Sequence, residues 1–367
     1  MRQVFSSSQS RHKSEVSVQQ DSAQQNSGAQ EDAYAQAGVN IAAGQQAVDL
    51  MASAVRATYG PEVLAGIGSF GGLYDASKLK NLAAPVLVAS TDGVGTKTKV
   101  AAKLGRWDTI GRDLVHHCVN DILVQGARPL FFLDYVASAR IAPEQIANLV
   151  TGVAAACQEI GCALLGGETA EMPGVYLPNE IDLAGTIVGV VERAQLLDGS
   201  RIQAGDVIIG LASTGLHTNG YTLARALLDS LSWTATHPTL NGSIGEALLQ
   251  VHRCYLAEIQ QLWDAGIAVH GLAHITGGGI TDNLPRILPP GLGAAIRLGT
   301  WPVLPIFDLI QQMGEVPLEQ MLHVFNMGLG MLVVVPADQF VQAQAVLADG
   351  CYSVGEIVSG QTGVQYV

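Results

Sequence analysis

The sequence predicts an α/β (α+β) protein built from two domains. Strand-like and helix-like segments alternate from Tyr34 to the C-terminus, as in chains that pack helices on sheets. The polar stretch "ERAQLLDGSRIQAGD" separates two such series. Apolar residues make up 48% of the 367 residues and charged residues only 14%, so the chain can bury large cores and has little charge for its surface. We therefore predict an N-terminal domain over 34–195 and a C-terminal domain over 196–367.

The first domain is predicted to begin with a helix over "AGQQAVDLMASAVRATYG". Val48, Met51 and Val55 recur there at helical spacing, and Gly60 with Pro61 ends the pattern. The segments that follow are, in order, a strand "APVLVAST", a helix "TIGRDLVHHCVNDILVQG", a strand "PLFFLDYVA", a helix "APEQIANLVTGVAAACQEIG" and the strands "CALLGG" and "IDLAGTIVGVV".

The second domain is predicted to begin with the strand "VIIGLAST". Helices are expected near 220–231 and 244–265 and a last helix near 337–349, with the strands "LAHIT", "GAAIRL" and "MLVVVP" between them. No short-period repeat is present.

Residues 1–33 differ from the rest in composition. They are rich in serine and glutamine and poor in aliphatic residues, which predicts a disordered polar tail. A cleavable transit peptide is the alternative, because Arg2, Arg11 and Lys13 precede the first acidic residue. Without that import the expected location is the cytoplasm, since the five cysteines form no C-x-x-C motif and suggest a reducing compartment.

Charge and hydropathy exclude two classes of partner. The net charge of -13 argues against a general affinity for nucleic acid. No apolar run approaches the roughly 18 residues that a membrane helix needs, so no membrane partner is expected.

The stretch "STDGVGTK" combines groups that suit a phosphate and a cation. A strand ends at Asp92, Gly93 and Gly95 allow a sharp turn, and Thr96 and Lys97 lead into a helix, whose N-terminus favours anions. The pattern is not a P-loop. A glycine turn with solvated lysines is the structural alternative.

A second carboxylate, Asp121, falls on the apolar side of a predicted helix, beside Cys118 and Ile122. It also lies in the last helical turn, where the helix dipole disfavours negative charge. A divalent cation would neutralise it, and Mg²⁺ suits oxygen ligands. An arginine partner, Arg128 or Arg140, is the alternative.

Glu168 follows the strand "CALL" in "GGETAEMPG", so Asp92, Asp121 and Glu168 are candidates for one metal site at a sheet edge, with a polyphosphate near Lys97. Glu171 would lie one turn further if the chain coils there. The loop "GIGSFGG", which contains Gly66, Gly68 and Gly71, follows no strand and is interpreted as a flap over phosphates rather than a dinucleotide site.

Two further candidate sites lie in the second half. "STGLHTNGY" places His217 and Asn219 in a turn before a helix, where both can face a cleft. "HITGGGITDNLPR" puts three glycines between a strand and a helix, next to Asp282, Asn283 and Arg286, which is a second setting compatible with phosphate. Two such settings suggest two phosphorylated ligands.

Six stretches together resemble the aminoimidazole ribonucleotide synthetases, also called phosphoribosylformylglycinamidine cyclo-ligases. In the order and spacing of that family they are "STDGVGTK", "CVNDILVQGARPLFFLDY", "GGETAEMPG", "STGLHTNGY", "HITGGGITDNLPR" and "FNMGLGM". The resemblance runs from about Tyr34 to the C-terminus.

The resemblance implies an enzyme of purine biosynthesis that uses ATP and Mg²⁺ to close formylglycinamidine ribonucleotide to aminoimidazole ribonucleotide. ATP would phosphorylate the formyl oxygen, and the amidine nitrogen of the substrate would then attack that carbon. The family fold implies a homodimer whose N-terminal strands form a barrel shared by two subunits, with a C-terminal α/β domain that contributes to substrate binding.

The resemblance also assigns roles to residues of this sequence. The metal and nucleotide phosphates would be held by Asp92, Asp121 and Glu168, and Lys97 would contact phosphate together with Gly93, Gly95 and Thr96. Gly66, Gly68 and Gly71 would lie near ATP. The substrate would meet His217, Asn219, Thr276, Gly277, Gly278, Gly279 and Asn283.

Three departures and two alternatives accompany this assignment. Gln36 and Asn40 stand where many relatives carry aspartate, the first helix has no lysine, and the N-terminal tail is outside the family pattern. One alternative is another ATP-using enzyme of the same superfold, of the thiamine-phosphate kinase or selenophosphate synthetase type. The other is a non-catalytic nucleotide-binding partner.

Overall fold

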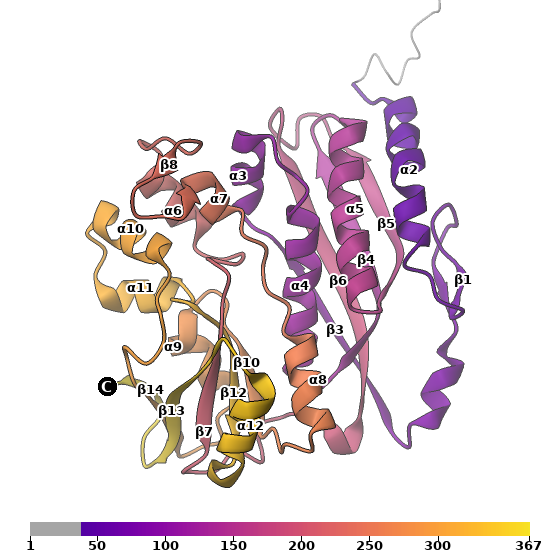
Figure 1. Cartoon of the computed structure of the whole chain (residues 1–367). Helices are drawn as coiled ribbons and strands as arrows, with labels where there is room; N and C mark the ends of the chain where they lie inside the picture. The colour runs from indigo at the N-terminus through magenta and orange to yellow at the C-terminus, as the bar shows by residue number, and fades with distance from the viewer. Residues whose placement is uncertain (1–37) are drawn as a thin grey trace, which may run out of the picture.

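The computed structural model describes residues 38–367, which form two α/β domains side by side (Figure 1). The polar tail predicted for residues 1–33 lies outside the described residues. None of the described helices is both long and apolar enough to cross a membrane.

The N-terminal domain contains a four-stranded sheet, a short hairpin and a layer of helices. Its elements are α2 (Ile41–Arg56), β1 (Val63–Ala65), β2 (Leu73–Tyr74), η1 (Ala76–Asn81), β3 (Pro85–Gly93), α3 (Lys97–Leu104), α4 (Ile110–Leu123), β4 (Arg128–Ser138), α5 (Pro143–Glu159), β5 (Ala163–Glu171), β6 (Ile181–Glu192) and η2 (Arg193–Gln195). The strand order is β3-β6-β4-β5, in which only β4 and β5 are parallel.

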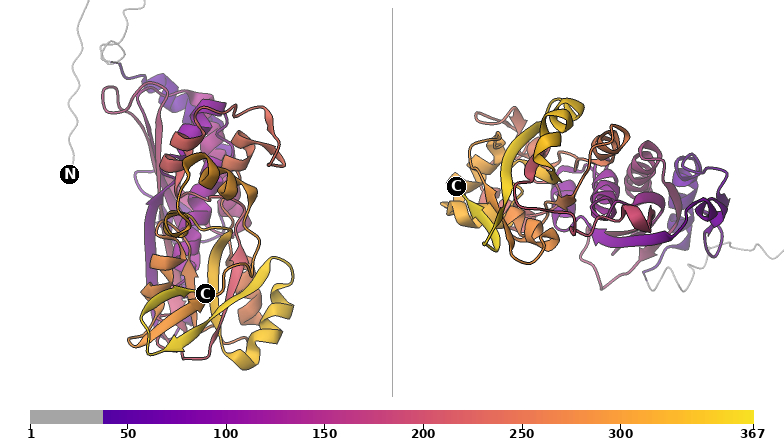
Figure 2. Two further views of the ribbon diagram at one scale, coloured as in Figure 1. Left: turned by 90° about the vertical axis from the view of Figure 1, so that its left-hand side faces the viewer. Right: turned by 90° about the horizontal axis from the view of Figure 1, so that it is seen from below.

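One face of this sheet is covered and the other is not. Along β6, fully buried residues alternate with partly exposed ones, as the two-residue period of a strand requires. On the buried side, α4 packs on β3, β6 and β4 and α5 packs on β5, whereas no described element covers the opposite face (Figure 2). That open face is apolar, with Leu87 62% and Leu133 36% exposed.

The C-terminal domain is built on a six-stranded mixed sheet of order β10-β12-β7-β13-β11-β14. Its elements are β7 (Val207–Ala212), α6 (Tyr221–Leu228), β8 (Thr236–His237), β9 (Gly242–Ser243), α7 (Ile244–Leu248), α8 (Leu256–Asp264), β10 (Gly271–His274), α9 (Gly279–Asn283), η3 (Leu284–Ile287), β11 (Leu292–Ile296), α10 (Pro305–Gly314), α11 (Leu318–Val324), β12 (Leu329–Val335), η4 (Ala337–Gln339), α12 (Phe340–Leu347), β13 (Cys351–Ser359) and β14 (Gly363–Tyr366).

The helix expected near 244–265 is wrong, because the chain forms two short helices with an irregular segment between them. In this segment, residues 249–255, several backbone N–H groups are taken by tertiary partners. His252 N donates to Asp113 Oδ1 over 2.7 Å and Tyr255 N donates to Asn120 Oδ1 over 3.0 Å. These partners belong to α4, so the segment lies against the N-terminal domain. The chain also continues as strand β5 to Glu171, where a helical turn was considered.

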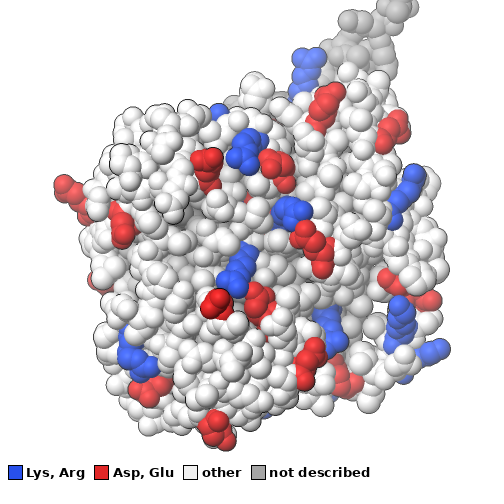
Figure 3. Space-filling view, in the orientation of Figure 1, with Lys and Arg blue, Asp and Glu red and all other residues white. Residues whose placement is uncertain are grey.

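The hydrophobic core is continuous across the two domains. Its largest cluster includes Ala47 of α2, Leu114 of α4 and Leu149 of α5, and it extends to Leu248 of α7 and Phe307 of α10. Charged side chains are sparse on the face shown in Figure 3, in keeping with the low charged content.

The contact between α4 and α5 depends on a glycine. A Cβ atom on Gly111 would lie 2.1 Å from the Leu149 carbonyl oxygen, closer than atoms can approach. We expect Gly111→Ala to destabilise the protein by about 1–3 kcal/mol, because the helices must separate. Gly44→Ala in α2 is the matched control: its Cβ would meet nothing closer than 3.8 Å. That change should stabilise by about 0.5–1 kcal/mol.

Denaturant unfolding followed by circular dichroism measures both changes. Equal stability of the two variants would contradict the close helix contact.

Candidate active site at the domain junction

Two carboxylates and a histidine meet where the N-terminal domain faces the C-terminal one. Asp92 lies near the end of β3, and α4 presents His117 and Asp121 four residues apart on one face. One ligand atom from each of the three lies within 4.8 Å of the other two. The sequence therefore predicted correctly that Asp92 and Asp121 lie close together.

Asp92 is fixed by two hydrogen bonds. His117 Nε2 donates to Asp92 Oδ2 over 2.7 Å, and Gly93 N donates to Asp92 Oδ1 over 2.7 Å. Burial raises the pKa of Asp92, but the hydrogen bond and charge of His117 outweigh it and leave the pKa below its usual value. The carboxylate is therefore ionised at neutral pH.

Asp121 is held by groups from both domains. His274 Nδ1, at the end of β10, donates to Asp121 Oδ1 over 2.8 Å, and Ser90 Oγ donates to Asp121 Oδ2 over 3.0 Å. Burial raises the pKa of Asp121, but the hydrogen bond from His274 outweighs it, so this carboxylate is also ionised. Neither Arg128 nor Arg140, the alternative partners considered from the sequence, forms an ion pair with it in the described structure.

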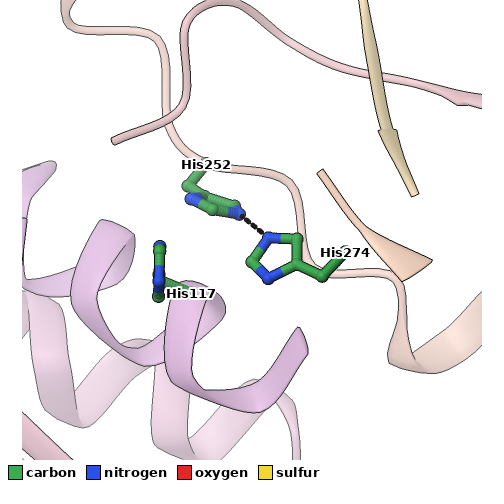
Figure 4. Close-up of side chains that lie close together, drawn as sticks. All are labelled: His117, His252 and His274. Atoms are coloured by element: carbon green, nitrogen blue, oxygen red, sulfur yellow. Dashed lines mark hydrogen bonds between the residues drawn. The ribbon is translucent and has the colours of Figure 1, made fainter. Parts of the chain in front are cut away.

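A cluster of buried histidines supports these carboxylates. His117, His252 and His274 come from α4, from the segment between α7 and α8 and from β10, and they converge in Figure 4. His252 Nε2 lies 3.1 Å from His274 Nε2, and Thr218 Oγ1 lies 2.7 Å from His117 Nδ1. Burial lowers the pKa of His252 and His274, which keeps both rings neutral, whereas the neighbouring Asp92 raises that of His117 against its burial.

The sequence missed most of this support. Ser90, His117, His252 and His274 were not assigned a role from the sequence. The available signal was a polar residue at the end of an otherwise apolar strand, as in "LAHIT". His252 carried no such signal, because only the tertiary fold brings residues 249–255 to this place.

Glu168 does not join the carboxylate pair within one chain. Asp92 pairs with Gly185, which pairs with Asp134, which pairs with Gly167. Glu168 is therefore three strands away from Asp92, on the opposite edge strand, a separation of about 14 Å. The expectation that the three carboxylates converge is corrected for the single chain, because β6 and β4 lie between them. Glu171 is occupied elsewhere: its Oε1 accepts a hydrogen bond from Ile141 N.

Glu168 instead lines a cavity of about 940 Å³, together with the loop that contains Gly66, Gly68 and Gly71. The loop joins β1 to β2, so the expectation that it follows no strand is wrong; β1 has only three residues and leaves no periodic pattern in the sequence. Apolar residues of α2 and α5 also line this cavity. Both the glycine loop and Glu168 thus belong to one hollow beside the edge of the sheet.

Lys97 is not positioned to contact a phosphate. Its side chain is fully buried, with Nζ 2.8 Å from Asp113 Oδ2 and 2.7 Å from the Gln250 carbonyl oxygen that it donates to. The glycine turn before it leads directly into α3, and this turns the side chain into the domain junction. Burial raises the pKa of Asp113 to about 6 even though Lys97 opposes the shift. Gly93, Gly95 and Thr96 form the turn itself, and Thr96 Oγ1 lies 3.1 Å from Thr222 Oγ1 of α6.

The predicted substrate residues lie nearby, but two of them have structural partners. His217 is buried, its ring stacks on His252 with centroids 4.1 Å apart, and its Nε2 accepts from Thr214 N. Asn283 Nδ2 donates to the carbonyl oxygens of Gly277 and Gly279 over 3.1 and 2.8 Å, which shapes the glycine turn. Asn219 is half-buried beside Gly277.

A cavity of about 410 Å³ is lined by Thr276 and Asn283 among the predicted substrate residues, but not by His217 or Asn219. It lies between β3 and α4 of one domain and β10, α9 and η3 of the other. Its lining includes Ser90, Asp121, His274, Thr276, Asn283 and Arg286.

Family models match both halves of the chain. Residues 75–191 match the N-terminal domain of AIR synthase related proteins, and residues 203–367 match their C-terminal domain.

Solved structures with low sequence identity share the fold. A thiamine-monophosphate kinase from Stenotrophomonas maltophilia is 22% identical, with a TM-score of 0.63, over 86% of this chain and 95% of that one. The hydrogenase maturation protein HypE in complex with ATP is 18% identical, with a TM-score of 0.63, over 89% and 92%. Fold and site together define a two-domain protein of the AIR synthase-related class.

Curated relatives narrow this class. The phosphoribosylformylglycinamidine cyclo-ligase of Desulfitobacterium hafniense is 52% identical over 91% of this chain and 99% of its own length. Enzymes of the same name from Geobacillus kaustophilus and Acetivibrio thermocellus are 51% and 47% identical, over 91% and 90% of this chain and 97% and 98% of their own lengths. The chain belongs to the phosphoribosylformylglycinamidine cyclo-ligase family.

The buried ion pair gives a prediction about stability. Lys97→Met removes the cation and leaves the Asp113 carboxylate buried without its partner, so it should cost about 3–5 kcal/mol in the free energy of unfolding. The double variant Lys97→Met/Asp113→Asn should recover much of this loss, because an amide can still accept the hydrogen bond from His252 N. Denaturant unfolding measures both. A Lys97→Met variant of normal stability but weakened ATP affinity would instead support a phosphate contact.

Proposed function

We infer that this protein closes formylglycinamidine ribonucleotide to 5-aminoimidazole ribonucleotide with ATP, a step of purine biosynthesis. The observation that carries this inference is 52% identity over nearly the whole length of a cyclo-ligase. The paired carboxylates at the domain junction support it. The ATP-complexed structure with the same fold agrees with ATP as the phosphoryl donor.

The chemistry needs phosphoryl transfer rather than a protein nucleophile. The formyl oxygen is a poor leaving group until it carries the γ-phosphoryl group of ATP. The amidine nitrogen of the substrate then attacks the same carbon, phosphate leaves, and loss of a proton completes the imidazole. Such a reaction depends on positioning and on charge stabilisation.

Asp92 and Asp121 are the residues that fit Mg²⁺. Both are ionised, both offer oxygen ligands, and His117 lies between them as a hydrogen-bond donor. Mg²⁺ bound there would neutralise the phosphate oxygens of the nucleotide. His117 and His274 orient the two carboxylates, and Ser90 fixes the second oxygen of Asp121.

A homodimer accounts for the uncovered apolar face and for the distant Glu168. A contiguous apolar sheet face is unusual on a monomer and favours a partner. If two sheets close into a barrel, the edge strand β3 pairs with β5 of the second subunit. Such a pairing would place β5 of the second subunit, the strand that carries Glu168, next to β3, the strand that carries Asp92. ATP would then span the carboxylate site and the cavity that contains the glycine loop.

An assay with formylglycinamidine ribonucleotide, ATP and Mg²⁺ tests the function. We expect aminoimidazole ribonucleotide, ADP and phosphate in equal amounts. Absence of the aminoimidazole product would overturn the inference. Phosphate transfer to thiamine phosphate would favour the kinase type, and nucleotide binding without turnover would favour a non-catalytic partner.

Asp121→Asn tests the metal role. The amide keeps the shape and can still accept from His274 but lacks the negative charge, so we expect at least a tenfold loss of Mg²⁺-ATP affinity with an unchanged melting temperature. Asp229→Asn, an exposed carboxylate paired with Lys103, is the matched control and should bind like the parent. Titration calorimetry measures the Mg²⁺-ATP affinity of each variant. If Asp121→Asn binds Mg²⁺-ATP as tightly as the parent, Asp121 has no metal role.

Light scattering tests the dimer. The parent should have the mass of two chains, and Leu87→Asp should be monomeric and inactive, because a charge then lies on the shared face. Val341→Asp, on α12 and 75% exposed, is the control and should remain dimeric and active. A monomeric parent would refute the dimer.

A further inference from the structure

Arg286 is the only lysine or arginine among the described residues that line the cavity of about 410 Å³. Other cations of the described chain form ion pairs: Lys97 with Asp113, Lys99 with Glu180, and Arg253 with Glu258. Arg286 has neither an ion pair nor a side-chain hydrogen bond to any described residue, and it lines the cavity of about 410 Å³. Arg286 as a residue is exposed. It is therefore the one positive charge on this wall that is available to a ligand.

The position of Arg286 is set by the fold. It belongs to η3, which packs against β10, the strand that carries His274. The same cavity contains Asp121, so Arg286 and the carboxylate site face one space. Asp198 also lines this cavity, and its Oδ1 accepts a hydrogen bond from Ser200 N over 2.9 Å.

Asn283 does not compete with Arg286 for an anion. Its amide nitrogen donates to carbonyl oxygens of the glycine turn, and its Oδ1 lies 3.3 Å from Thr276 Oγ1. The turn is thus held in shape from within. An anionic ligand in this cavity needs a donor from elsewhere on the wall, and a guanidinium matches the geometry of a phosphate in a bidentate manner.

The proposed substrate supplies such an anion. The substrate named in the relatives' enzyme name has a phosphoribosyl group. Its phosphate is at one end of the molecule, and the reacting formyl and amidine groups are at the other end. A substrate in this cavity with its reacting end toward Asp121 would leave the phosphate to a cation on the wall.

We propose that Arg286 binds the phosphate of the phosphoribosyl substrate and so sets its orientation in the cavity. The proposal rests on the function inferred above for the identity of the ligand. An exposed arginine that is merely solvated is the competing explanation, and it predicts no effect on binding.

Kinetics give the first test, with Arg286→Ala, Arg286→Lys and the control Arg225→Ala, an arginine of α6 that lines none of the cavities described above. We expect Arg286→Ala to raise KM for the substrate roughly 10- to 100-fold, with kcat and KM for ATP nearly unchanged. Arg286→Lys should recover part of the loss, and Arg225→Ala should behave like the parent. An unchanged KM for the substrate, or a rise in KM for ATP instead, would overturn the proposal.

A binding measurement separates this proposal from the proposed function. By calorimetry, the parent should bind ribose 5-phosphate in preference to ribose, and Arg286→Ala should lose at least tenfold in affinity for ribose 5-phosphate. If no aminoimidazole forms but this loss is seen, the function fails and the phosphate site stands. If the product forms while the parent and Arg286→Ala bind ribose 5-phosphate equally, or neither binds it, the phosphate site fails alone. Equal melting temperatures of the variants exclude a folding defect.

Discussion

The hydrogen bond from His274 to Asp121 joins the two domains at the point where the chemistry is expected. An isolated carboxylate near the C-terminal end of a helix is unfavourable, and the ring from the other domain offsets that cost. His274 itself is held by His252. His117, which donates to Asp92, contacts Thr218 of the C-terminal domain through its other ring nitrogen. The orientation of both carboxylates therefore depends on how the domains pack, and the site exists only when both are in place.

Strong local patterns were sufficient for most of the fold. The alternation of apolar runs and helical periodicity predicted β3, α4, β4, α5, β5, β6 and β7 in order, and the resemblance to the cyclo-ligases is confirmed by the relatives. The helix expected over 244–265 failed because its backbone donors are used by side chains of α4, which no local pattern reveals. β13 and β14 were not anticipated, since burial does not alternate regularly along β13 and β14 has only four residues.

The site was predicted only in its carboxylates. Asp92 and Asp121 stand out in the sequence because an acidic side chain among apolar ones needs compensation, and that argument correctly placed them together. The same argument cannot say which strands lie between two candidates, and so it grouped Glu168 with them. Charge alone likewise suggested Lys97 as a ligand contact, although its ammonium is used to neutralise Asp113 in the interior.

The segment over residues 249–255 has a thermodynamic consequence. Its backbone donors end on Asp113 and Asn120, and the largest core cluster runs through both domains. Separating the two domains would leave Asp113 and Asn120 without these hydrogen-bond partners and would expose apolar surface of the shared core to water. The two domains should therefore melt as one cooperative unit, and neither half expressed alone should hold its native form, although each has its own sheet.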